Sequence, residues 1–373
     1  MLRSRLPFVT ALAASAAFAL VGLASCPAQA QFGVTNFQTI DPPFADPSPN
    51  PYDFVSGAYG ISNNGSIVGF YTDTDNTLQP PGYNASQRGY ILQNGVFTSV
   101  SYPNQVGTLY NSTLLNGINS LGVSAGAYQV YDYNTGNLVS QTNFIRSSAG
   151  VFSTPTVTPT ATGTITAFGA INDAGLVATQ YTDGGRTHGA LYDANTNTFT
   201  FLLPDFISGG NTFVQTINNN GVIVGSYDNG QGGAAQPFVY RNGAYTNVSY
   251  NAPGATATRF NGINSSGIVS GRYLDGNGLS HGLLYNSNNG LFSAFDVPGA
   301  SQTFLFQGSI NDSNQIAGQY NDQNGNTHSF TAVVVAAPEP SALGLLATGA
   351  GLLCSTTLVR RRCRSSKGAA PKA

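Results

Sequence analysis

The 373-residue chain contains no tryptophan, one methionine and only three cysteines. The cysteines are Cys26, Cys354 and Cys363, and all three lie near the ends of the chain. The residues between these ends can therefore form no disulfide, no thiolate nucleophile and no cysteine-ligated metal site. The stability of the central part must come from its packed core alone.

Charged residues are also scarce, at 8% of the chain. Lysine occurs only at Lys367 and Lys372, and the single glutamate is Glu339. Residues 31–337 contain fifteen aspartates against six arginines, a balance of −9. An acidic body without lysine argues against nucleic acid as a partner, because that affinity comes largely from Lys and Arg on phosphates. General acid–base catalysis in this body would have to use aspartate or histidine.

What the sequence does contain is one motif written six times, of which Asn261–Tyr273 (NGINSSGIVSGRY) is one copy. Each copy has an Asn or Ser, then a Gly or Asn three residues later, then a Tyr six residues after that. The first positions are Ser62, Asn119, Asn172, Asn218, Asn264 and Asn311; the second are Gly65, Gly122, Gly175, Gly221, Gly267 and Asn314; the tyrosines are Tyr71, Tyr128, Tyr181, Tyr227, Tyr273 and Tyr320. Such a period indicates stacked or radial repeats.

Each copy has the chemistry of a β-hairpin. The Asn or Ser can bond its own backbone two residues on, and the Gly or Asn tolerates a positive φ. A strand rich in β-branched residues follows, with a central Gly (Gly69, Gly126, Gly225, Gly271 and Gly318) that indicates close approach of another backbone. Between hairpins lie further short runs such as His281–Tyr285 and Gly290–Gly299. Four strands in roughly 45 residues predict an all-β fold, a β-propeller of six four-stranded blades over residues 31–337. Seven blades and an open solenoid are the alternatives.

Residues 1–30 are typical of a secretory signal peptide. Arg3 and Arg5 precede an apolar run, and Ala28 and Ala30 form the A-x-A cleavage site. The alternative is a lipoprotein signal, since residues 23–26 (LASC) resemble a lipoprotein box that would make Cys26 a lipidated N-terminus.

The C-terminal end carries the most specific motif. Pro338, Glu339 and Pro340 precede the uncharged run 341–359, which is long enough to span a bilayer as a helix, and then come Arg360, Arg361 and Arg362. Under the positive-inside rule the arginines and the tail 365–373 stay cytoplasmic. Residues 338–364 resemble the PEP-CTERM sorting signal of Gram-negative bacteria. That resemblance implies a membrane-anchored precursor, processing by an exosortase, and a final location at the cell surface or in the extracellular matrix.

The repeats resemble a family too. Asn261–Tyr273 with His281–Tyr285 and Phe295–Ala300 is similar to the HAF extracellular repeats of exported bacterial proteins. This resemblance covers roughly residues 34–335. It implies a propeller-like body and no established catalytic, cofactor or metal residues.

The polar repeat positions have structural interpretations. His188, His281 and His328 occupy one repeat position, which favours bonding to a neighbouring turn over a shared metal ion. Aspartates follow the hairpin tyrosines (Asp73, Asp183, Asp228, Asp275 and Asp322), where they favour turns over a weak Ca²⁺ site. No nucleophile elbow, phosphate loop or zinc-protease motif is present.

The first two repeats have extra residues, at 73–87 and 129–141, that we expect to form longer loops. Tyr83, Tyr131 and Tyr133 in these loops are the candidates for contact with sugars or partners. The sequence thus favours a non-enzymatic structural or binding protein of the cell surface or exopolysaccharide matrix. The alternative is a secreted polysaccharide hydrolase or lyase that uses aspartates at the propeller mouth.

Overall fold

The computed structural model describes residues 32–43, 45, 56–72, 87–103, 110–132, 135–231 and 234–336. These residues form strands, turns and irregular segments. They include no helix, and so none that is long and apolar enough to cross a membrane. The predicted signal peptide, the predicted sorting signal with its expected helix at 341–359, and the tail 365–373 lie outside the described residues.

Consecutive strands pair antiparallel into groups of four. The first two groups are β2 (Ser56–Ile61), β3 (Ile67–Thr72), β4 (Gln87–Gln93) and β5 (Val96–Val100), then β6 (Tyr110–Ile118), β7 (Ser124–Tyr131), β8 (Leu138–Arg146) and β9 (Phe152–Ser153). One parallel pair, Gln87 with Ser112, joins these two groups into a single eight-stranded sheet.

Three four-stranded sheets follow along the chain. They contain β10 (Thr164–Ile171), β11 (Leu176–Asp183), β12 (Arg186–Asp193) and β13 (Thr198–Leu202); β14 (Asn211–Ile217), β15 (Ile223–Asp228), β16 (Gln236–Arg241) and β17 (Ala244–Asn247); and β18 (Ala257–Ile263), β19 (Ile268–Leu274), β20 (Ser280–Asn286) and β21 (Phe292–Phe295). The last sheet has the order β1-β24-β23-β22 and combines β22 (Gln302–Phe304), β23 (Gln315–Asn321) and β24 (Thr327–Ala336) with β1 (Phe32–Thr39) from the other end of the described chain.

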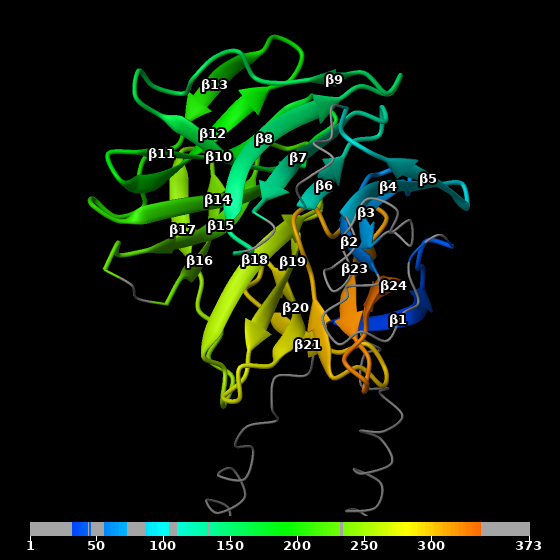
Figure 1. Cartoon of the computed structure of the whole chain (residues 1–373). Helices are drawn as coiled ribbons and strands as arrows, with labels where there is room; N and C mark the ends of the chain where they lie inside the picture. The colour runs from blue at the N-terminus through cyan, green and yellow to red at the C-terminus, as the bar shows by residue number, and fades with distance from the viewer. Residues whose placement is uncertain are drawn as a thin grey trace, which may run out of the picture.

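The groups stand around a common axis (Figure 1). The first strands β2, β6, β10, β14 and β18 contact one another in sequence order. Radially arranged four-stranded antiparallel meanders define a β-propeller-type fold. The structure therefore confirms the predicted all-β propeller class from its strand order and register.

The hydrophobic core is divided into clusters that lie between neighbouring groups of strands. One cluster joins Leu191 of β12 to Phe238 of β16, and another joins Val224 of β15 to Phe260 of β18. Phe238 and Phe260 are almost completely buried. Burying such a side chain contributes about 1.5–3 kcal/mol, so the packing between sheets is the main source of stability in a body without disulfides.

The hairpin chemistry predicted from the motif is confirmed. The residues at the fourth turn position all have positive φ, for example 82° at Gly65 and 59° at Asn314. The central strand glycines face the preceding strand at very short range: a Cβ on Gly225 would lie 2.0 Å from the Phe213 carbonyl oxygen. A register shift of the inner strand, such as the one between Val214 and Thr216, lies beside four of the five contacts, those of Gly69, Gly126, Gly225 and Gly271. A bulge presses the inner strand onto its neighbour, and only a residue without Cβ fits there.

The ring is closed by the N-terminal segment. Strand β1 pairs with β24 from Phe32↔Ala336 to Thr39↔Phe330. Just after β1, the Asp41 carboxylate accepts hydrogen bonds from the Ser329 amide (2.9 Å), from the Ser56 hydroxyl (2.6 Å) and from His328 Nδ1 (2.6 Å). One carboxylate therefore ties the first group of strands to the last.

This closure should depend on pH. The hydrogen bond to Asp41 raises the pKa of His328 more than burial lowers it, and the charges of Asp41 and Asp322 add to the rise. A raised pKa in the folded state means that the contribution to stability is fully present below about pH 6.5, the ordinary value, and is lost as pH rises through the folded-state pKa. We expect His328→Gln to destabilise the protein most at about pH 5.5 and least above pH 8, measured by urea denaturation followed by circular dichroism.

Glutamine already occupies the equivalent strand position at Gln236, so the substitution suits the fold. Asp41→Asn is the matched variant, because it removes the charge that raises the pKa and should flatten the same pH dependence. An equal loss of stability in His328→Gln at all pH values would contradict the role of this ion pair.

Candidate functional site

The hairpin turns of all the groups meet at one end of the axis, and in five of the six turns one asparagine both caps its own turn and bonds the next turn. Asn218 Oδ1 accepts hydrogen bonds from the backbone amides of Asn220 (3.0 Å) and Val222 (2.9 Å). The first of these bonds is the one predicted from the motif. Asn218 Nδ2 then donates to the Asn264 carbonyl oxygen of the next turn at 2.9 Å. A single buried amide thus shapes its own turn and holds the next one.

The same bond repeats around the axis as an asparagine ring. The donors and acceptor carbonyls are Asn119 to Asn172 (3.2 Å), Asn172 to Asn218 (3.2 Å), Asn264 to Asn311 (3.2 Å) and Asn311 to Ser62 (3.0 Å). Serine at position 62 cannot reach across. There Asn64 Nδ2 makes the link instead, to the Ser120 carbonyl at 2.9 Å. The last turn bonds the first, so the ring closes.

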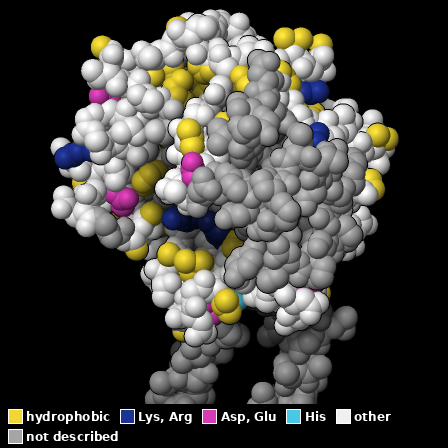
Figure 2. All heavy atoms as spheres, viewed as in Figure 1, with side chains coloured by type: hydrophobic (Ala, Val, Ile, Leu, Met, Phe, Trp, Pro, Cys, Tyr) yellow, Lys and Arg dark blue, Asp and Glu magenta, His cyan; other side chains and the backbone are white. Residues whose placement is uncertain are grey.

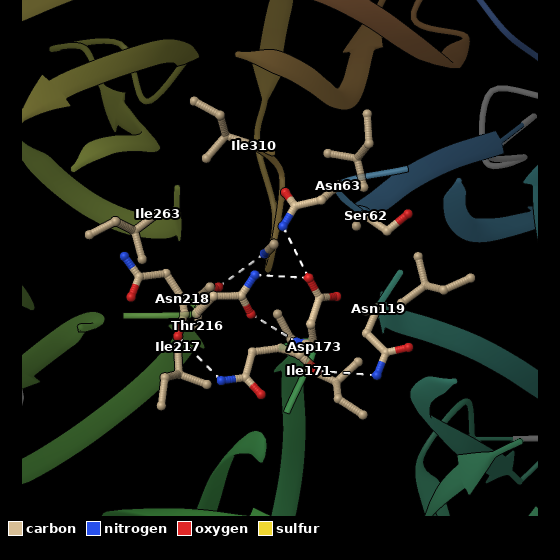
Figure 3. Close-up of a pocket in the computed structure, with 18 of the residues that line it drawn as sticks. Ser62, Asn63, Asn119, Ile171, Asp173, Thr216, Ile217, Asn218, Ile263 and Ile310 are labelled. Atoms are coloured by element: carbon tan, nitrogen blue, oxygen red, sulfur yellow. Dashed lines mark hydrogen bonds between the residues drawn. The ribbon is translucent and has the colours of Figure 1, made fainter. Parts of the chain in front are cut away.

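Two carboxylates, Asp173 and Asp312, form a second layer at this mouth. Figure 3 shows Asp173 with its hydrogen bond to Asn63. Asp173 accepts hydrogen bonds from the Ser120 amide at 2.7 Å and from Asn219 Nδ2 at 2.8 Å. Asp312 accepts from the Ser265 amide at 2.6 Å and from the Ser265 hydroxyl at 2.9 Å. Asn63 Nδ2 bridges the two carboxylates, at 3.2 Å from Asp173 and 2.9 Å from Asp312. Every carboxylate oxygen at the mouth is thus held by at least one protein donor.

The electrostatics of Asp173 follow from these bonds. Burial acts most strongly and opposes its ionisation, but the hydrogen bonds from Ser120, Asn219 and Asn63 together outweigh it. The pKa of Asp173 consequently lies below its ordinary value. An ionised carboxylate at neutral pH cannot serve as the proton donor of a general-acid step.

The cavity behind this mouth is small, at about 50 Å³. Its wall is the isoleucine that precedes the turn residue in all six copies, and its floor is closed where Gly60, Gly117 and Ala170 meet. A Cβ on Gly117 would lie 2.7 Å from the Ala170 Cα. The Thr216 hydroxyl crosses the axis, donating to the Asn261 carbonyl and accepting from the Gly308 amide. Such a volume suits water, whereas ligand pockets measure about 300–1,000 Å³.

The histidines are bonded to neighbouring segments, as the sequence predicts. His188 Nδ1 lies 2.7 Å from Asp205, and His281 Nδ1 lies 2.9 Å from Asp296. With His328 they stack on the hairpin tyrosines of their own sheets, at centroid distances of 5.0–5.2 Å. The three lie on different sheets, and the described residues include no group of three or more His, Cys, Asp or Glu that could hold a metal ion.

The aspartates after the hairpin tyrosines act in turns. Asp275 Oδ1 accepts from the amides of Asn277 and Leu279, both at 2.8 Å. Asp322 binds the corresponding amides of Asn324 and Asn326, also at 2.8 Å. These are the turn bonds that the sequence favours over calcium ligation. Asp73 lies outside the described residues.

The predicted contact tyrosines are only partly described. Tyr131 lies on strand β7, so the expectation of a loop there is wrong: Gln129–Tyr131 pairs with Leu138–Gln141 and extends the hairpin, with a register shift between Val130 and Tyr131. Its hydroxyl donates to Gln129 Oε1 at 2.8 Å. Tyr83 and Tyr133 lie outside the described residues, as do Ala28, Ala30, Pro338, Glu339, Pro340 and Arg360–Arg362.

Sequence reasoning missed the layer of Asn63, Asp173 and Asp312. A signal was present: the residue after each turn Asn or Ser reads Asn63, Ser120, Asp173, Asn219, Ser265 and Asp312. This order repeats after three copies, so the two aspartates lie three hairpin turns apart along the chain. In the structure Asn63 bonds both.

Comparison with protein families finds no match, and comparison with curated proteins finds no relative. Among solved structures, the chain is similar to TolB from Acinetobacter baumannii (12% identity, TM-score 0.44, covering 75% of this chain and 64% of that one). It is also similar to a Trypanosoma rangeli sialidase (9%, 0.45, 75% and 54%) and to the Aleuria aurantia lectin (8%, 0.41, 76% and 97%). The match thus spans less than two thirds of the TolB and sialidase chains.

The asparagine ring should carry measurable stability. Asn218→Asp keeps the acceptor that caps the turn but replaces the donor with a charged acceptor facing the buried Asn264 carbonyl. We expect a loss of about 3 kcal/mol in the free energy of unfolding. Asn218→Ser, which copies Ser62, should cost about 1 kcal/mol. Urea denaturation measures both.

Asn229 is the matched control, because its side chain is exposed and caps only its local turn, at the Gln231 amide. Asn229→Ala should change stability by less than about 0.5 kcal/mol. If Asn218→Asp were as mild as this control, the ring would not be a stabilising element.

Proposed function

We propose that this protein is an exported, non-enzymatic β-propeller of six blades that serves as a structural or binding module of the cell surface or exopolysaccharide matrix. The observation that carries the proposal is the state of the repeated turn face. Its amides and carboxylates are engaged in bonds between sheets, and the cavity they enclose is only about 50 Å³. A face built in this way holds a scaffold together and offers little room for a substrate.

The blade count is supported by the asparagine ring. Its links run once around the axis from the first turn to the sixth and back to Ser62. The eight-stranded sheet would then be two blades, since a single parallel pair joins its halves. Residues 31–337 would form one domain whose N-terminal strand completes the sixth blade.

Export is supported by the two ends of the chain. Residues 1–30 have the pattern of a signal peptide, and residues 338–364 resemble a PEP-CTERM signal. The cysteine-free body between them needs no oxidative folding. In this proposal the helix 341–359 holds the precursor in the inner membrane until an exosortase-type enzyme processes it near Pro338–Pro340.

Removal of residues 338–364 should therefore abolish surface retention. In the native host, the full chain is expected in the surface or matrix fraction with its C-terminal segment removed, as read by mass spectrometry. The shortened chain should be released without that processing. Deletion of residues 365–373 alone is the control and should leave the location unchanged. An unprocessed full chain that stays in the inner membrane would contradict the proposal.

The alternative is a polysaccharide hydrolase or lyase. Asp173 and Asp312 favour it, because both accept a hydrogen bond from the same Asn63 nitrogen and so lie within about 10 Å of each other, the range that paired catalytic carboxylates need. Against it stand the lowered pKa of Asp173 and the small cavity. The carboxylates are better suited to closing the mouth.

A glycan screen with residues 31–337 separates these functions. We expect the body to remain folded by circular dichroism, to retain one or more extracellular polysaccharides, and to release no new reducing ends or unsaturated products. Asp173→Asn and Asp312→Asn should lower stability without changing glycan retention. Product formation that disappears in both variants would establish the enzyme instead.

A further inference from the structure

Two arginines lie side by side on the fifth group of strands. Arg259 of β18 and Arg272 of β19 are direct cross-strand partners. Arg259 is exposed and Arg272 is half-buried. Like charges directly opposite each other on a sheet are destabilising. We therefore expect either a negatively charged partner that neutralises the two arginines or a function that requires them.

Nothing in the described part of the chain neutralises it. Neither guanidinium makes a hydrogen bond or ion pair with any described residue, whereas Arg241 donates to the Ser287 hydroxyl at 3.1 Å. The charge that acts on Arg272 at neutral pH is that of Arg259, and no carboxylate is among the groups that shift its pKa. In a body with an excess of nine negative charges, this is an unusual place for two cations.

Aromatic rings surround Arg272. Its guanidinium carbon lies 5.5 Å from the ring centre of Phe304 and 5.6 Å from that of Phe306. Tyr59 of β2 packs on Phe306 at 4.4 Å and on Phe70 at 5.3 Å. These aromatic side chains come from the first and last groups of strands, whereas Arg272 belongs to the fifth. The site therefore combines side chains from three groups. Cation–π contacts hold the guanidinium in place and leave its N–H donors available.

The site is cationic at neutral pH. Burial, assisted by the nearby charge of Arg259, lowers the pKa of Arg272 to about 10, which still leaves it protonated. Burial raises the pKa of Tyr59 to about 12, although Arg272 opposes the rise, so the phenol is neutral. Figure 2 shows Lys or Arg side chains in a hollow over β18 and β19, next to hydrophobic side chains.

The pair is specific to one repeat. The positions equivalent to Arg272, one before each hairpin tyrosine, are Phe70, Ala127, Gln180, Ser226 and Gln319. The positions equivalent to Arg259 on the preceding strands are Gly57, Leu114, Ala167, Phe213 and Phe304. The scaffold therefore does not require arginine at either place.

We propose that Arg259 and Arg272, with the rings of Tyr59, Phe304 and Phe306, form a binding site for a saccharide that bears a carboxylate. This proposal rests on the proposed matrix function and names its ligand class. The planar guanidinium binds a carboxylate through two parallel N–H···O bonds, which a neutral sugar cannot match. The aromatic surface beside it provides the apolar wall against which a sugar ring packs.

The acidic body makes this recognition local. Charges beyond about 8 Å are largely screened at physiological ionic strength, so the remaining aspartates act weakly on a ligand held at the arginines. Residues 31–337 carry only four other arginines, so the body offers a polyanion little attraction elsewhere, and the basic residues at the two ends of the chain are the same in every variant. The part of the binding that depends on the arginine pair should weaken as salt rises.

Titration calorimetry of the full-length chain in non-ionic detergent tests the proposal, with trigalacturonic acid and its fully methyl-esterified, neutral form as probes. The wild type should bind the acid at least about tenfold more tightly than the ester. Arg272→Gln and Arg259→Gln should each remove most of that preference. Arg272→Lys, which keeps the charge but loses the planar fork, should retain part of it. Arg186→Gln is the matched control, since it removes one exposed positive charge from another sheet.

Thermal denaturation separates binding from structure. Glutamine stands at the equivalent positions 180 and 319, and removal of one like charge relieves repulsion, so Arg272→Gln should leave Tm unchanged or raise it. If an arginine variant has a lower Tm but keeps its preference for the acid, the arginines contribute to stability and not to binding. That result would overturn the proposal.

The remaining outcomes are distinct. Equal binding of acid and ester, unaffected by either arginine variant, overturns this site but leaves a glycan-binding matrix protein in place. Binding of neither probe, together with an empty glycan screen, overturns the proposed binding function as well. Full competition by sulfate at equal concentration would show a general anion site, and it would equally refute a saccharide site.

Discussion

The structure depends on one hydrogen bond, the one that an asparagine amide donates to the carbonyl of the next hairpin turn. Adjacent sheets are otherwise held by apolar contact, which is strong but does not specify how far one sheet rotates or slides against the next. The buried Asn218 amide donates to the Asn264 carbonyl, and this bond positions the following turn. Repeated around the axis, this bond sets the angle between sheets and brings the last turn back to the first.

Closure then limits what the centre can do. The inner strands converge until Gly117 contacts Ala170, and Thr216 spans the axis by two hydrogen bonds. The asparagine mouth holds little more than water, and Asp173 and Asp312 are occupied by neighbouring donors. Polar and charged side chains that do not take part in these bonds occur at positions where the six copies differ from one another. The arginine pair of the fifth repeat is the clearest example, because its charges repel each other and lack a carboxylate partner among the described residues.

Local features were largely predictable. The positive φ at Gly65 and Asn314 follows from residue type, as does the close approach of a backbone at Gly225. The turn bonds of Asp275 were also predictable, since they act over a few residues. For the histidines the sequence predicted a bond to a neighbouring segment but not the partner, such as Asp296 for His281. Tyr131 was misplaced, because length alone does not distinguish a loop from an extended hairpin. The carboxylate layer was missed, because Asn63 and Asp312 are 249 residues apart and meet only when the ring closes.

The sequence by itself determined the repeat, the order of strands and turns in each copy, the excess of negative charge, and the absence of cysteine from the body. These features depend only on composition and on spacing within about 50 residues. Only the tertiary structure decided which side chains of different copies touch. It placed Asp41 against Ser329, joined Asp173 to Asp312 through Asn63, and set Arg259 beside Arg272 over the rings of Phe304 and Phe306. The reason is geometric: a closed ring brings together residues from opposite ends of the chain, and no local pattern encodes that distance. The asparagine of the hairpin turn belongs to both descriptions, as a local cap on its own backbone and as a link to the next sheet.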